Sequence, residues 1–205
     1  MTSINDKNWQ ALHPNEVKQL LKDLAIPWWI AGGWAIDLFV GNQTREHLDI
    51  DVLILRKDQF IIKDYLSDWL LYKTNQPGLL LWDKREFLEI GVNSIWCKKD
   101  EQSPWLMEIM FLDSEDDEWF YRREPKIREP INQIGNITKD NIPYLLPEIQ
   151  ILFKAKRHSE VKNEQDFQNA LPLLSEQQKH WLIKSLNIEF PNGHIWIDYI
   201  KLFNK

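Results

Sequence analysis

Asp49 and Asp51 carry the clearest chemical signal in the chain, because they stand one residue apart at the head of an apolar run, D-I-D-V-L-I-L. In a strand, side chains at i and i+2 point to the same face, so the two carboxylates would lie side by side. Carboxylates this close repel each other unless a cation lies between them or one is protonated. Their oxygen atoms suit a hard divalent cation such as Mg²⁺. An isolated D-x-D is more often a solvated strand edge, so the interpretation depends on its surroundings.

Gly32 and Gly33 supply those surroundings. They follow the apolar run 27–31, which predicts a buried strand, and they precede an expected helix over 34–40 that Gly41 would end. A glycine turn between strand and helix lets backbone N–H groups and the helix N-terminus hold phosphate oxygens. Phosphate beside paired carboxylates indicates a metal-bound nucleotide.

These residues also carry a family resemblance. The segment G-G-W-A-I-D over 32–37, followed by G-x-x-T-R-E-H-x-D-I-D over 41–51, resembles the nucleotidyltransferases that modify antibiotics. The similarity is greatest to the aminoglycoside 2''-adenylyltransferase type and extends more loosely to the lincosamide enzymes. It implies that Asp49 and Asp51 bind Mg²⁺ and that the glycine turn holds the triphosphate. The usual turn is Gly-Ser, so the missing serine hydroxyl removes one phosphate contact here.

A third acid is expected on a later strand. The pattern over 105–112 predicts a strand in which Glu108 is the one carboxylate among apolar neighbours, a costly position unless the group is paired or bound to metal. The resemblance implies that a third carboxylate takes the proton from the attacking hydroxyl. Glu108 is the favoured candidate for this base and for the metal site. Asp113 is the rival, although it is better explained as the end of the strand and the start of the acidic run 113–118.

Three basic side chains are candidates for binding the nucleotide. Arg45 and His47 lie in the connection to the second strand, and Lys154, or its neighbour Lys156, ends an expected helix over 147–157. The alternative is that these groups pair with nearby acids or complement the helix C-terminus.

Composition narrows the choice of partners. The 205 residues carry a formal net charge of −6, which argues against a general nucleic-acid binder and suits a cationic acceptor. The single cysteine, Cys97, excludes an intramolecular disulfide and is expected to be a small buried side chain. Neither a secretion signal nor an apolar run of membrane-spanning length is visible, so a cytoplasmic protein is expected.

The remaining pattern predicts an α/β (α+β) fold, a nucleotidyltransferase-type mixed sheet with flanking helices followed by a C-terminal helical bundle. A catalytic domain over 1–135 and a helical domain over 136–205 are expected, with a Pro-flanked linker at 125–130. Turn residues Asn75, Pro77 and Gly78 separate short strands. Further strands are expected over 28–31, 51–55, 69–72, 79–82, 87–90 and 93–98. Further helices are expected over 14–24, after Asp58 to 66, after Asn163 to 171, after Ser175 to 186, and over 195–203.

The sequence therefore predicts an Mg²⁺-dependent transferase that moves a nucleoside monophosphate, AMP from ATP, to a hydroxyl of a small molecule such as an aminoglycoside-like antibiotic. Two alternatives stay open at this point. One is a toxin-like nucleotidyltransferase that modifies a protein or tRNA. The other is a nucleotide-binding module that has lost catalysis. The sequence does not indicate an oligomeric state.

Overall fold

The computed structural model describes residues 8–203 apart from 75–77 and 84, so the turn expected at Asn75 and Pro77 lies outside the described residues. The chain divides into two compact units. Unit 1 comprises Met1–Ile30 and His47–Ser114, and unit 2 comprises Ala31–Glu46 and Glu115–Lys205. The predicted domain boundary after residue 135 is a statement about which segments fold independently, so it stays a prediction. In its packing, the segment Ala31–Glu46 from the N-terminal half belongs with the C-terminal unit.

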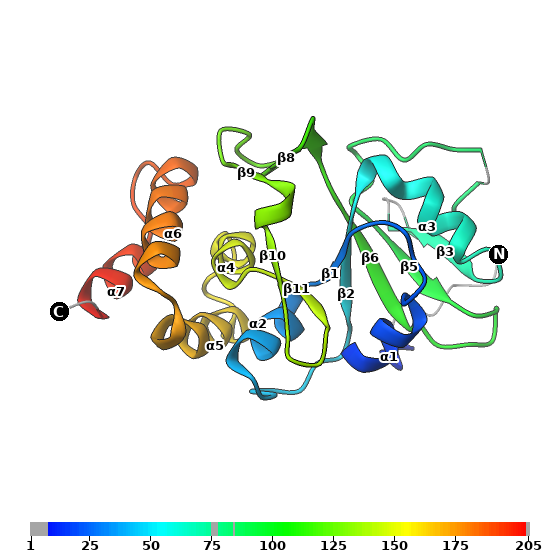
Figure 1. Ribbon diagram of the computed structural model, residues 1–205, viewed down its shortest axis with the longest axis horizontal. Coiled ribbons are helices and arrows are strands. Elements are labelled where there is room, and N and C mark those ends of the chain that lie inside the picture. The colour runs from blue at the N-terminus through cyan, green and yellow to red at the C-terminus, as the bar shows by residue number, and fades with distance from the viewer. Residues whose placement is uncertain (1–7, 75–77, 84, 204–205) are drawn as a thin grey trace. The chain divides into compact units, whose positions relative to one another are not determined.

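Unit 1 is built on a mixed sheet with the strand order β1-β2-β6-β5-β3-β4 (Figure 1). β2 and β6 run parallel, whereas β1 with β2 and β5 with β6 are antiparallel. This confirms the expected mixed sheet. The strands are β1 (Trp28–Ile30), β2 (Asp51–Leu55), β3 (Leu70–Lys73), β4 (Leu80–Leu81), β5 (Ser94–Lys98) and β6 (Met107–Leu112).

Two helices accompany this sheet. α1 (Pro14–Leu20) begins with a capping box, in which the His13 side chain accepts from the backbone and Glu16 returns a contact to the His13 N–H. α3 (Gln59–Tyr65) follows the 3₁₀ turn η1 (Arg56–Asp58) and covers one face of the sheet (Figure 1). The expected cap at Asp58 is wrong in detail, because the Asp58 side chain makes no capping hydrogen bond.

The strand expected over 87–90 does not form. Buried side chains satisfy the backbone of this segment instead: Arg56 Nη1 donates to the carbonyl oxygens of Leu88 and Glu89, each at 3.1 Å. Gln59 Oε1 accepts the Leu88 N–H at 2.6 Å. A backbone whose donors and acceptors are taken by side chains has no need of a neighbouring strand.

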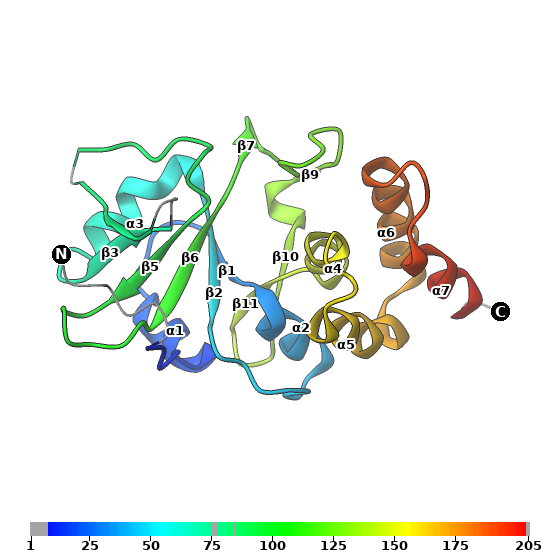
Figure 2. The same cartoon turned by 180° about the vertical axis from the view of Figure 1, so that it is seen from behind.

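Unit 2 is mainly helical, and α2 packs against α4 and α5 within it (Figure 2). α2 starts at Gly32, two residues earlier than expected, and Gly41 closes it in the left-handed conformation with φ 92°. α6 begins with the predicted Ser175–Gln178 capping box. The helices are α2 (Gly32–Val40), α4 (Pro147–Ala155), α5 (Val161–Ala170), η3 (Leu171–Leu173), α6 (Glu176–Glu189) and α7 (Ile195–Phe203).

Several details of this region differ from expectation. Asn163 lies inside α5 rather than capping it, and its side chain donates to the carbonyl oxygen of Arg157 at 2.9 Å. The segment expected as a linker contains β9 (Arg128–Pro130), which pairs with β8 (Glu118–Phe120). A hairpin of β10 (Gly135–Ile137) and β11 (Pro143–Leu145) follows, after η2 (Ile131–Gln133); β7 is Ser114–Glu115.

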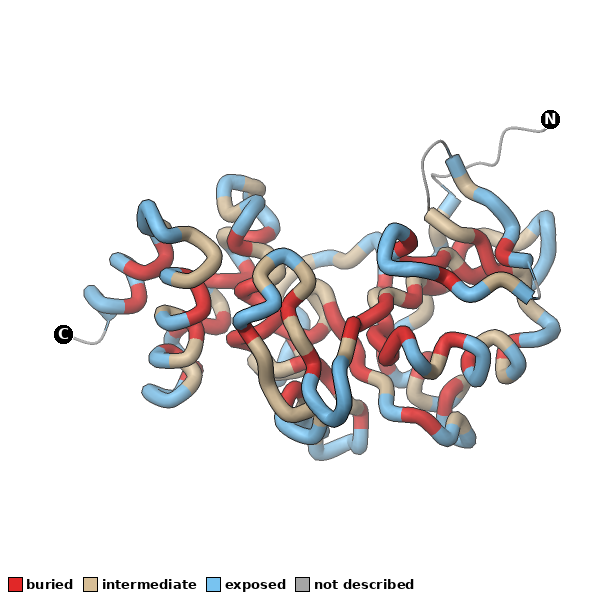
Figure 3. Tube along the Cα trace, turned by 90° about the horizontal axis from the view of Figure 1, so that it is seen from above, coloured by how far each residue is buried: buried red, intermediate tan, exposed pale blue. Residues whose placement is uncertain are grey.

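The buried residues run along the strands of unit 1 and one face of the unit 2 helices, while exposed residues lie on turns and on the other face of the helices (Figure 3). Cys97 is fully buried, as expected, and burial followed by the charge of Glu108 raises the pKa of its thiol. No helix in the described part of the chain is long and apolar enough to cross a bilayer.

Candidate active site

Asp51 and Glu108 lie directly opposite each other on the parallel strands β2 and β6. Both stand at the start of their strands, so their side chains are brought to one edge of the unit 1 sheet. Asp49 precedes β2 and is exposed, yet the ladder continues beside it, because the Glu108 N–H donates to the Ile50 carbonyl oxygen at 2.9 Å. The three predicted acids therefore occupy neighbouring positions.

Glu108 has the environment expected of a proton acceptor. It is half-buried, and the residues opposite it on the neighbouring strands are Asp51 of β2 and Trp96 of β5. Burial raises the pKa of its carboxyl above the ordinary value, hydrogen bonds from the side chains of Ser94 and Trp96 oppose the shift, and the charge of Asp49 adds to it. A carboxylate with a raised pKa is a better base near neutral pH.

Asp113, the rival for the third acid, is placed differently. It follows the far end of β6, five residues beyond Glu108, which is about 17 Å along an extended strand. It is buried and ion-paired with Arg56, whose guanidinium also contacts the carbonyl oxygen of Val92. Asp113 thus helps Arg56 to hold the 88–92 loop in place. It lies at the opposite end of the parallel strands from Asp51.

The glycine turn forms the start of α2 in unit 2. Gly32 has φ 65°, in the left-handed region, which explains a glycine at this position. Its N–H donates to Oε1 of Gln150 on α4 at 2.8 Å. Gly33 lies within the first turn of the helix, whose backbone N–H groups face the N-terminus. Gln150 was not identified from the sequence, because an amide inside an apolar helix gives no specific pattern.

Asp37 and Thr44 fix the loop that leaves α2. Asp37 is buried, and its Oδ1 accepts from the Thr44 N–H at 3.1 Å and from the Thr44 hydroxyl at 2.5 Å. The Gly41 N–H donates to the Asp37 carbonyl oxygen at 2.8 Å. Asp37 and Thr44 of the matched segment thus have a structural role, holding the loop that carries Arg45.

Arg45 and Lys154 meet on Asp166, a residue of α5 that was not singled out from the sequence. Arg45 makes a bidentate contact with Asp166, with Nε–Oδ1 at 2.8 Å and Nη2–Oδ2 at 3.0 Å. Lys154 Nζ lies 2.8 Å from Asp166 Oδ2. Burial alone would raise the pKa of Asp166, but Arg45 and Lys154 hold it below its usual value. Its signal in the sequence is a carboxylate on the buried stripe of α5, next to the core residue Phe167.

His47 is half-buried in unit 1, two residues before Asp49. Within the ranges 8–74, 78–83 and 85–203, no three or more His, Cys, Asp or Glu side chains are already arranged as metal ligands. The evidence for the acid site is therefore strand position, donor chemistry and charge.

Comparison with known proteins bears on the fold and the family of the chain. The lincosamide resistance protein of Staphylococcus haemolyticus is 39% identical over 36 residues, which span 18% of this chain and only 22% of that protein. The solution structure of the antibiotic-resistance factor ANT(2'')-Ia matches with TM-score 0.56 and 16% identity over 87% of this chain and 91% of its own.

The crystal structure of the lincosamide antibiotic adenylyltransferase LnuA, bound to lincomycin, matches with TM-score 0.52 and 21% identity over 76% of this chain and 92% of its own. Both structures confirm the predicted fold class. The model of the aminoglycoside-2''-adenylyltransferase family matches residues 15–167, about three quarters of the chain. The chain belongs to the aminoglycoside-2''-adenylyltransferase family, and its enzyme class is that of the nucleotidyltransferases.

Proposed function

We propose that the protein is an Mg²⁺-dependent cytoplasmic enzyme that transfers AMP from ATP to a hydroxyl of a small antibiotic-like molecule. The observation that carries the proposal is the register of Asp51 and Glu108, which places a base candidate beside a metal-ligand candidate on adjacent strands. Family membership supports the reaction class. The net charge of −6 favours an acceptor with cationic groups.

Asp49, Asp51 and Glu108 fit Mg²⁺ by the chemistry of their donors. All three offer carboxylate oxygens, and the charge of Asp49 already raises the pKa of Glu108, so like charge accumulates where a cation would relieve it. When bound, Mg²⁺ would neutralise charge on the triphosphate and lower the pKa of the acceptor hydroxyl.

Glu108 is the group that receives the proton. As the acceptor oxygen forms its bond to the α-phosphorus, the bond between that phosphorus and the pyrophosphate oxygen breaks, and the hydroxyl proton passes to a Glu108 carboxylate oxygen. Burial of this carboxyl favours its neutral, protonated product.

Unit 2 carries the candidates for binding phosphate. Gly33 and its neighbours at the α2 N-terminus offer backbone N–H groups for phosphate oxygens. Arg45, in the loop after α2, and Lys154, on α4, both contact Asp166 on α5. We assign Arg45 and Lys154 to the triphosphate, with Asp166 holding both side chains in place. His47, in unit 1, stays a candidate contact to the nucleotide.

The test is incubation with each labelled NTP, Mg²⁺ and a panel of aminoglycosides and lincosamides. We expect a labelled small molecule and pyrophosphate, with ATP as the preferred donor. The matched control is Asp51→Asn, which should lose transfer. Label appearing in tRNA or in protein would identify the alternative acceptors. No transfer from any NTP by the wild-type protein, despite nucleotide binding, would support the non-catalytic alternative.

A further inference from the structure

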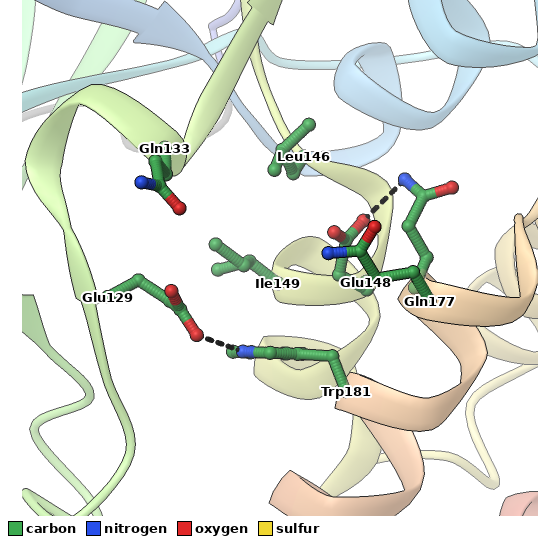
Figure 4. A pocket seen from close by; sticks show the side chains of 8 residues that line it. Glu129, Gln133, Leu146, Glu148, Ile149, Gln177 and Trp181 are labelled. Atoms are coloured by element: carbon green, nitrogen blue, oxygen red, sulfur yellow. Dashed lines mark hydrogen bonds between the residues drawn. The ribbon is translucent and has the colours of Figure 1, made fainter.

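Unit 2 contains a cavity of about 300 Å³ that has no part in the site described above. Its walls come from β9, η2, the start of α4 and the first half of α6 (Figure 4). The volume is at the lower end of the range for small-molecule sites. The lining residues are Glu129, Gln133, Leu146, Glu148, Ile149, Gln177, Gln178 and Trp181.

The charge of this lining is negative. Among the described residues that line it, two are carboxylates and none is lysine, arginine or histidine. Glu148 is buried, with 7% of its surface exposed, and Glu129 is half-buried. Burial raises the pKa of Glu148, hydrogen bonds from its own backbone and from Gln178 oppose the shift, and the charge of Glu129 raises it further. The two carboxylates therefore repel each other electrostatically across the cavity.

Neighbouring donors hold both carboxylates in place. Gln178 Nε2 donates to Glu148 Oε2 at 2.8 Å. The orientation of this amide is fixed, because its Oε1 accepts the Ser175 N–H at 2.9 Å in the capping box of α6. Trp181 Nε1 donates to Glu129. Each carboxylate is thus preorganised by a neutral donor, which leaves its negative charge uncompensated.

The rest of the lining is apolar or aromatic. Figure 4 shows Glu129 and Glu148 on opposite sides of the cavity, with Ile149 and the indole of Trp181 between them. An indole face attracts cations and also packs against hydrocarbon. A bare divalent metal would use only the two carboxylates, whereas an organic ammonium group on a small apolar body would use the carboxylates and the apolar walls.

We propose that this cavity is a binding site for a small organic amine, whose ammonium group lies between the carboxylates of Glu129 and Glu148 and whose apolar body packs on Trp181 and Ile149. The site is distinct from the candidates for nucleotidyl transfer, because none of its lining residues is assigned to the nucleotide or to the acids. Its occupation would stabilise the junction between β9, α4 and α6, since a ligand that binds only the folded state adds to stability.

Benzylamine is a suitable probe, and benzyl alcohol is its neutral counterpart of similar shape. Binding is followed by calorimetry and by the indole N–H signal of Trp181 in a ¹⁵N-labelled protein, assigned from a Trp181→Phe variant. Benzylamine should bind and shift the Trp181 signal, and benzyl alcohol should bind at least about tenfold more weakly, since a hydrogen-bonded ionic contact is lost.

Glu148→Gln and Glu129→Gln keep side-chain size and remove one charge each, so each should weaken benzylamine binding about tenfold. Glu124→Gln is the control, because it makes the same change outside the cavity. Equal binding of the alcohol and the amine would overturn the proposal, as would unchanged affinity in both cavity variants. Because these measurements use neither NTP nor acceptor, their outcome is independent of whether nucleotidyl transfer is observed.

Discussion

Glu108 lies on the largely buried strand β6 and stands opposite Asp51 of β2. Its raised pKa follows from burial first and from the charge of Asp49 last, with Ser94 and Trp96 acting in the opposite direction. A carboxylate held in this way stores unfavourable electrostatic free energy that a bound cation would release.

We therefore expect Glu108→Gln to lower transfer by about 10²–10⁴-fold, the range for losing a general base, while nucleotide binding largely survives. Because the native pKa is raised, the charged form destabilises the fold above that pKa, and the apo variant should melt no lower than wild type at neutral pH. Single-turnover assays and thermal denaturation measure the two effects.

Asp113→Asn is the contrasting variant. It leaves Arg56 buried without its partner carboxylate, so it should lower the free energy of unfolding by about 3–5 kcal/mol and affect turnover only through folding. Near-normal transfer by Glu108→Gln, together with a stable but inactive Asp113→Asn enzyme, would reverse the assignment of the third acid.

Variants of Gly32 and Gly33 distinguish a role in backbone conformation from a role in contacting the nucleotide. Gly32→Ala places a side chain at φ 65°, so it should destabilise the protein by about 1–2 kcal/mol. Gly33 is helical, and Gly33→Ala should leave stability almost unchanged while weakening ATP binding, because its methyl group obstructs the phosphates. Denaturation and calorimetry distinguish the two. Equal ATP affinity in Gly33→Ala and wild type would remove the phosphate role.

At the level of elements, the sequence predicted those whose pattern is local. Gly41 in the left-handed conformation ends α2, and the Ser175–Gln178 capping box begins α6; both signals were predicted. The strand predicted over 87–90 was wrong, because the side chains that bond its backbone, Arg56 and Gln59, are far away in sequence. The ion pair between Arg45 and Asp166 could not be predicted for the same reason, because the two residues are 121 positions apart.

The α2, α4 and α5 group depends on Asp166, which is fully buried and bound by Arg45 and Lys154. Asp166→Asn leaves two cations without their carboxylate and should lower the free energy of unfolding by about 3 kcal/mol at pH 7. The folded pKa of Asp166 is lowered, so this stabilisation is present above the unfolded pKa and disappears as the pH falls through the folded value.

Urea denaturation between pH 7 and pH 3 measures this effect, and the difference between wild type and Asp166→Asn should shrink toward the acid end. Glu160→Gln, at the N-cap of the same helix, is the control, because its partner Arg157 is 77% exposed and a surface pair contributes about 1 kcal/mol or less. A pH-independent difference between wild type and Asp166→Asn would show that the network is not electrostatic.

At the level of the whole molecule, the two units are interleaved along the chain, since Ala31–Glu46 packs with Glu115–Lys205. The apolar pattern does not indicate this interleaving, because the buried face of α2, with Ala35 and Ile36, would suit packing in either half of the chain. The predicted boundary at 135/136 would also cut through β10, which pairs with β11. A test of whether residues 136–205 fold alone therefore distinguishes the predicted domain boundary from the two interleaved units.

We expect residues 136–205 and residues 115–205, expressed alone, to expose the α4 and α5 surfaces that α2 covers, and to lack a cooperative unfolding transition. Joining 31–46 through a flexible linker to 115–205 should restore cooperativity, because it returns α2 together with Arg45, the partner of Asp166. Circular dichroism with urea titration compares the three polypeptides. The same fusion carrying Asp166→Asn is the specific control, and it should lose most of the recovered stability. Cooperative unfolding of 136–205 alone would instead establish the sequence-based boundary and show that α2 is dispensable for the C-terminal fold.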